Sequence, residues 1–141
     1  MVIKIDKPQR DLKGDFDAGF VCEKDFIKYY KYVYTEDIVD KPFGLYGIDF
    51  ASKDLKAFYE LKLCRRRVFS IRESQLQKYN TFCKEHDEPV YLVVKVAIWN
   101  GDRRRNGWWI KDMREVLNSI DYFKRDESGW IVVKGKGFRR L

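Results

Sequence analysis

Histidine and cysteine are scarce in this chain, which has one histidine and three cysteines among 141 residues. Cys22, Cys64 and Cys83 are widely spaced and form no CxxC pair. A disulfide framework usually uses an even number of cysteines in a secreted chain, and a zinc or iron–sulfur site usually needs several ligands at short spacings. The sequence argues against both kinds of site, and we expect thiols that are buried or incidental.

Long apolar runs, internal repeats and low-complexity segments are also lacking. No run approaches the roughly 18 apolar residues that cross a bilayer. The first residues, MVIKIDKPQRD, lack the apolar stretch of a signal peptide. We therefore expect a cytoplasmic protein without a membrane partner.

What the chain does contain is positive charge together with enough apolar residues for a core. Lysine and arginine number 29 against 22 aspartate and glutamate, and hydrophobic residues make up 45% of the chain. A basic domain of this kind often binds phosphate groups, although a basic surface can also serve solubility alone. We expect one domain over residues 1–141, with a core over about 15–99 and a C-terminal extension over about 100–141.

Apolar periodicity predicts the elements of the first half of the core. Helical spacing of apolar residues runs over 15–34. Strands are predicted over 45–50 and 57–63, on either side of a turn at 52–54. These elements form a helix followed by a hairpin.

The rest of the chain adds a second helix and a buried strand. Ser70 and Glu73 have the spacing of a capping box, which predicts a helix from there to residue 85. The continuous apolar run 91–99 predicts a central strand, and Asp112 begins a short helix before a hairpin over 120–134. With a brief strand-like piece at 68–69, the order is α-β-β-β-α-β. The expected fold is α/β, a central mixed sheet flanked by helices, with a C-terminal helix and hairpin.

Two carboxylates and a lysine stand out on the predicted hairpin. A turn centred between Asp54 and Leu55 places Asp49 opposite Glu60, with Cβ atoms about 5 Å apart. Side chains alternate along a strand, so Lys62 lies on the same face as Glu60. Adjacent carboxylates repel unless a cation lies between them, and Mg²⁺ prefers such oxygen ligands. A lysine beside that ion suits phosphodiester hydrolysis.

The Glu-x-Lys spacing alone is a weak signal, because chance supplies about three acid-x-Lys triplets in a chain of this composition. Only one of those present lies in an apolar strand with an aspartate on the preceding strand. A solvated charged face with a Glu–Lys pair remains the alternative. The triplets are Asp11-Leu12-Lys13, Asp54-Leu55-Lys56 and Glu60-Leu61-Lys62.

Residues 46–96 resemble the core of PD-(D/E)XK nucleases, a group that includes archaeal Holliday-junction resolvases and RecB-like exonucleases. The family pattern is an Asp at a strand end, matched by Asp49, then Glu-x-Lys on the next strand, matched by Glu60-Leu61-Lys62. A helix that often starts Ser-Gln-Leu follows, matched at Ser74-Gln75-Leu76. Ile48 stands where many members have proline, the histidine and cysteine motifs of some RecB-like relatives are absent, and the last 40 or so residues match no named family pattern.

The resemblance implies a restriction-endonuclease-like core and an Mg²⁺- or Mn²⁺-dependent deoxyribonuclease. By this resemblance Asp49 and Glu60 bind the metal, Lys62 positions water or stabilises charge, and Gln75 assists. Many members carry a further metal-binding glutamate on the amino-terminal helix, and Glu23 is the candidate here. Resolvase-like members act as dimers, so a homodimer acting on DNA is possible.

Arginine clusters provide candidate nucleic-acid contacts. One follows the predicted catalytic strand and the other lies in the loop before residue 107, and both suit backbone phosphates. Arginines at an exposed strand edge also discourage aggregation, which is the alternative explanation of the first cluster. The clusters are Arg65, Arg66 and Arg67, and Arg103, Arg104 and Arg105.

Two other functions remain open. One is a basic DNA- or RNA-binding protein without catalysis, in which the acidic face is structural. The other is an inactive nuclease fold that serves as an assembly subunit. A binder depends on its arginines and on salt concentration, whereas an enzyme depends on Glu60 for turnover.

Overall fold

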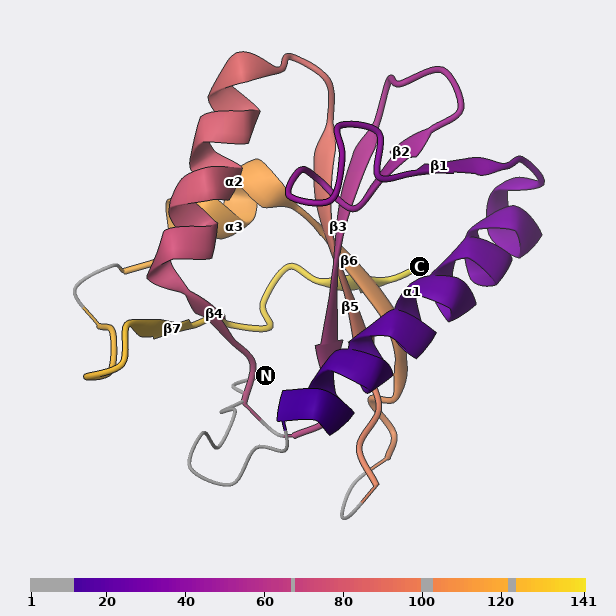
Figure 1. The fold of residues 1–141 in the computed structure, drawn as a ribbon. Helices are drawn as coiled ribbons and strands as arrows, with labels where there is room; N and C mark the ends of the chain where they lie inside the picture. Colours follow the sequence, from indigo (N-terminus) through magenta and orange to yellow (C-terminus); the bar gives the residue numbers. More distant parts are fainter. Residues whose placement is uncertain (1–11, 67, 100–102, 122–123) are drawn as a thin grey trace.

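A six-stranded sheet forms the centre of the molecule (Figure 1). The structure is a computed structural model that describes residues 12–66, 68–99, 103–121 and 124–141, with the backbone alone for 12–21. Neighbouring strands are antiparallel except β3 and β5, which run parallel. The protein is therefore α/β with a mostly antiparallel mixed sheet, as the sequence predicts. The strand order is β1 (Ile38–Asp40), β2 (Phe50–Ser52), β3 (Phe58–Cys64), β5 (Val90–Val96), β6 (Gly107–Asp112) and β8 (Arg139–Arg140).

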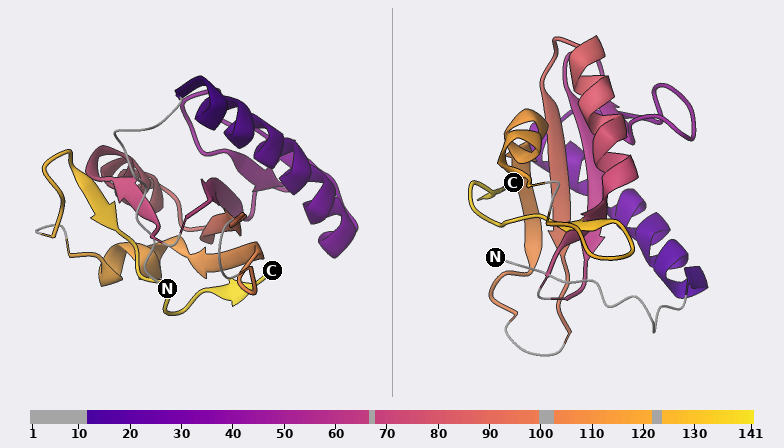
Figure 2. Two further views of the ribbon diagram at one scale, coloured as in Figure 1. Left: turned by 90° about the horizontal axis from the view of Figure 1, so that it is seen from below. Right: turned by 90° about the vertical axis from the view of Figure 1, so that its left-hand side faces the viewer.

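Helices cover both faces of this sheet. Phe26 and Tyr30 of α1 (Leu12–Tyr34) pack on one face, against a cluster that includes Tyr59 and Leu61 of β3. Helices α2 (Glu73–Glu85) and α3 (Met113–Ser119) cover the other face, and Figures 1 and 2 show α1 apart from this pair. Side chains alternate along a strand, so Glu60 and Lys62 belong to the face that α2 covers.

Strand β5 is the buried centre that its apolar run predicts. Val90, Leu92, Val93, Val94 and Val96 are all buried, since helices cover both faces and strands flank both edges. The strand ends at Val96, short of the predicted residue 99. Helix α2 connects β3 to β5, which is the crossover that a parallel pair requires.

The turn between β2 and β3 forms where the sequence predicts it. Phe50 pairs with Tyr59, the register that sets Asp49 opposite Glu60. The Ser52 hydroxyl donates to Asp54 at 2.8 Å and accepts from the amide of Ala57 at 3.1 Å, which closes the turn.

The strand predicted over 45–50 is wrong, because β2 begins only at Phe50. Residues 41–47 form consecutive turns, in which the Gly44 amide donates to Lys41 O and the Gly47 amide to Gly44 O. Gly44 has a φ of +93°, a conformation that favours glycine. The short β1 that pairs with β2 was not predicted.

The predicted capping box is also wrong. Ser70 lies in strand β4 (Ser70–Arg72), which pairs antiparallel with β7 (Trp130–Val132). Helix α2 starts at Glu73 without a side-chain cap, and the Glu73 amide donates to Gly129 O at 2.9 Å. Its carboxylate accepts from Arg125 at 3.0 Å. The helix ends at Glu85, as predicted.

The C-terminal region departs in part from its predicted hairpin. A turn at 126–129 forms, yet β7 pairs with β4, and among the residues described in this region it bridges back only between Ile131 and Arg125. Asp112 caps α3 as expected, accepting from the amide of Arg114 at 2.8 Å. Within the described ranges, no helix combines the length and apolar character that crossing a membrane requires.

Candidate active site

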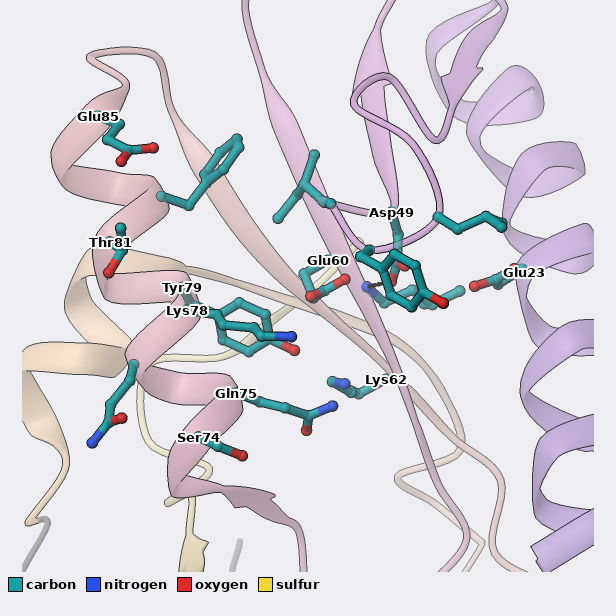
Figure 3. Close-up of a pocket in the computed structure, with 17 residues that line it drawn as sticks. Glu23, Asp49, Glu60, Lys62, Ser74, Gln75, Lys78, Tyr79, Thr81 and Glu85 are labelled. Atoms are coloured by element: carbon teal, nitrogen blue, oxygen red, sulfur yellow. Dashed lines mark hydrogen bonds between the residues drawn. The ribbon is translucent and has the colours of Figure 1, made fainter.

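A pocket of about 750 Å³ opens beside β3 (Figure 3). Glu60, Leu61 and Lys62 of β3 line it, and the segment 45–49 forms another part of its wall. Glu23 reaches it from α1, opposite the polar face of α2. That face of α2 contributes Ser74, Gln75, Gln77, Lys78, Tyr79 and Thr81.

The short length of β2 creates the carboxylate pair. Beyond Tyr59 no described strand pairs with this edge of β3, so the Leu61 amide has no strand partner there. Asp49 Oδ2 accepts from that amide at 2.9 Å. The Asp49 side chain thus takes the place of a strand carbonyl, which brings it beside Glu60. The sequence predicted this neighbourhood correctly, although Asp49 precedes β2 and does not lie in a strand.

Glu60 is buried, with 6% of its surface exposed. Burial raises the pKa of Glu60 well above the usual glutamate range, and a hydrogen bond with Asp49 and the charge of Asp49 raise it further. Lys62 and the Tyr79 hydroxyl lower that pKa in part. Burial and the neighbouring Asp49 therefore both favour the protonated form of Glu60.

Tyr79 is a site residue that the sequence analysis did not single out. Burial raises the pKa of Tyr79 well above its usual range, and the neighbouring Glu60 adds to the effect. The Lys62 ammonium lies 5.8 Å from the centre of the Tyr79 ring. Tyr79 follows Gln75 by one helical turn, so helical spacing from the predicted Gln75 could have identified it. Figure 3 shows Gln75 extending from α2 toward Lys62.

Lys41 is the second unforeseen residue. Its ammonium nitrogen lies 3.0 Å from Glu23 Oε1 and 3.6 Å from Asp49 Oδ1. It also lies 3.6 Å from Asp40 Oδ1. Burial lowers the pKa of Lys41, but the bond to Glu23 and the nearby carboxylates outweigh burial and raise it overall. No spacing in the sequence connects Lys41 with this site.

The donor set suits a hard divalent cation. Mg²⁺ is often bound by one or two carboxylates, with water and substrate phosphate completing its coordination. Asp49 and Glu60 form such a pair, and because Asp49 disfavours the charged form of Glu60, a cation between them would balance the charge. Glu23 lines the pocket but is bonded to Lys41. Among the described residues, no group of three or more His, Cys, Asp or Glu side chains is arranged as a metal site.

The described arginines of the two clusters lie outside the pocket. Arg65 and Arg66 are exposed just after β3, and Arg103, Arg104 and Arg105 are exposed after β5. Because β3 and β5 run parallel, both sets lie at the same end of the sheet (Figure 2). The Arg103 guanidinium forms hydrogen bonds within its own loop, donating to Trp99 O at 2.7 and 3.2 Å. Arg67 lies outside the described residues.

Comparison of the chain with models of known protein families, with curated proteins and with solved structures finds no match.

Proposed function

We propose that this protein is a metal-dependent nuclease that hydrolyses phosphodiester bonds in DNA on a restriction-endonuclease-like core. The observation that carries the proposal is the convergence of Asp49, Glu60 and Lys62 in one pocket beside β3. A buried carboxylate whose pKa is perturbed, such as Glu60, next to a lysine in a concave site is typical of catalytic centres.

Each residue has a role that follows from its position. Asp49 and Glu60 would hold Mg²⁺ or Mn²⁺, which lowers the pKa of bound water and balances charge on the phosphate. The Leu61 amide orients the Asp49 carboxylate for this task. Lys62 would position the attacking water or stabilise the developing negative charge, and Gln75 would orient Lys62 from the wall formed by α2.

Cleavage of labelled DNA tests the proposal. Linear, single-stranded, flapped and four-way-junction DNAs would be incubated with Mg²⁺ or Mn²⁺ and the wild type, Glu60→Gln or Lys62→Ala. We expect wild-type cleavage, and losses of about 100-fold or more in both variants, with DNA binding retained. Glu115→Gln and Lys53→Ala are matched controls, since both side chains are exposed outside the pocket.

A non-catalytic DNA- or RNA-binding protein is the second candidate. The exposed arginines at one end of the sheet favour it, because they can bind phosphate without using the pocket. Binding to every DNA without cleavage of any, with either metal, would replace the nuclease proposal by this one. Sedimentation with and without DNA tests the homodimer that is expected of resolvase-like nucleases.

A further inference from the structure

The Lys41 ammonium is surrounded by carboxylates from three segments of the chain: Glu23 of α1, Asp40 of β1 and Asp49 before β2. The side chains of Lys41, Glu23 and Asp49 are 22%, 28% and 18% exposed. Exposed ion pairs stabilise little and are readily screened by salt, but these three side chains are mostly withdrawn from water, whereas Asp40 is 56% exposed.

The backbone holds Lys41 in this place. Its amide donates to Asp49 O at 2.8 Å, and its carbonyl accepts from Gly44 at 3.1 Å. Its φ of +49° is uncommon for a residue other than glycine. The ammonium also lies 5.2 Å from the centre of the Phe50 ring. Lys41 is therefore built into the site through both its backbone and its side chain.

Asp49 is shared by two positions that suit a cation. One lies toward Glu60, with which Asp49 is hydrogen-bonded. The other lies toward Glu23, and the Lys41 ammonium occupies it at 3.0 Å from Glu23 and 3.6 Å from Asp49. Catalytic sites with two metals hold their ions about 3.5–4 Å apart, so neighbouring positions of this kind share ligands.

We infer that Lys41 fills the cation position between Glu23 and Asp49 with its own ammonium group, so that the site takes up one divalent ion and not two. The inference rests on the proposed function, because it assumes an ion between Asp49 and Glu60. It excludes Glu23 from the metal ligands of the wild type. A second divalent ion would face the positive charge of Lys41 at close range, which opposes its binding.

Counting bound Mn²⁺ tests the inference without an activity measurement. Electron paramagnetic resonance of free Mn²⁺ gives the stoichiometry for the wild type, Lys41→Gln and Lys41→Arg. We expect one ion in the wild type, two in Lys41→Gln, and one in Lys41→Arg, which restores the cation. Lys53→Gln removes the same charge from an exposed position outside the pocket and should bind one ion.

Each outcome has one meaning. Two ions in the wild type, or one ion in a folded Lys41→Gln variant, would overturn the role of Lys41 and leave the proposed nuclease intact. No ion in the wild type would overturn this inference together with the metal site of the proposed function. Two ions in the wild type would contradict the inference whether or not Lys41→Gln folds.

Discussion

The pocket beside β3 and the segments that follow the parallel strands β3 and β5 differ in charge. The pocket is lined by Glu23, Asp49, Glu60 and Glu85 against Lys62 and Lys78, whereas exposed arginines follow β3 and β5. At about 3.3 Å per residue, Glu60 and Arg65 lie roughly 17 Å apart along the chain. The arginines that would attract a polyanion thus lie apart from the residues that would carry out the chemistry. In the pocket a phosphate would meet more carboxyl groups than ammonium groups, and a bound cation would offset them.

Removing the arginines should have the largest effect, and it should fall on binding. A variant with four arginine-to-glutamine changes should lower the slope of log K against log salt by up to about 3–4, and weaken DNA binding about 100-fold. The cleavage rate of saturated enzyme should stay unchanged, because the pocket is intact. Fluorescence anisotropy at several salt concentrations measures the slope. The positions changed are Arg65, Arg66, Arg104 and Arg105.

A control with the same charge sharpens this result. The control variant replaces four exposed lysines that lie outside the segments following β3 and β5. Its slope of log K against log salt should change far less. Equal slopes in the two variants would show that phosphate contacts are not concentrated in the segments following β3 and β5. The control positions are Lys28, Lys53, Lys56 and Lys84.

Loss of Arg114 should have the next largest effect, by loosening the wall of the pocket. Its guanidinium donates to Glu88 O and Cys83 O at 3.0 Å each, and to His86 O, so it satisfies carbonyls at and just beyond the end of α2. We expect Arg114→Met to lower the free energy of unfolding by about 2–3 kcal/mol, seen in urea titrations. Arg105→Met, at an exposed position, should change it little, and similar losses in both variants would contradict the capping role.

Of the changes in stability, that of Glu60→Gln should be the smallest, and its size should depend on pH. The raised pKa of Glu60 in the folded protein means that its stabilising contribution is complete below the ordinary glutamate pKa and is lost as pH rises through the raised value. Glutamine mimics the protonated acid. Without divalent metal, the variant should melt about 3 °C or more above the wild type at neutral pH, and this gap should close in acid.

Melting curves from pH 4 to pH 8 in a chelator measure the gap, with Glu115→Gln as an exposed control. A gap that is absent at neutral pH, or that grows toward acid, would mean that Glu60 is not held protonated by its surroundings.

Part of the fold and of the candidate site was predictable because it depends on neighbours in the chain. The turn at 52–54 and the alternation along β3 come from short-range geometry, and together they bring Asp49 beside Glu60. The helix ending at Glu85 and the capping Asp112 are equally local. The pairing of Ser70 with Val132 was missed because a competing strand from a distant segment overrides the local capping pattern.

By itself, the sequence determined the period of each element, and therefore which face of β3 bears Glu60 and Lys62. Only the tertiary structure decided that Glu60 is buried and that Lys41 lies among carboxylates from separate segments. The physical reason is the distance along the chain between the residues that interact. Backbone geometry and turn hydrogen bonds depend on residues close in sequence, whereas burial and the local field depend on every segment that packs around a side chain.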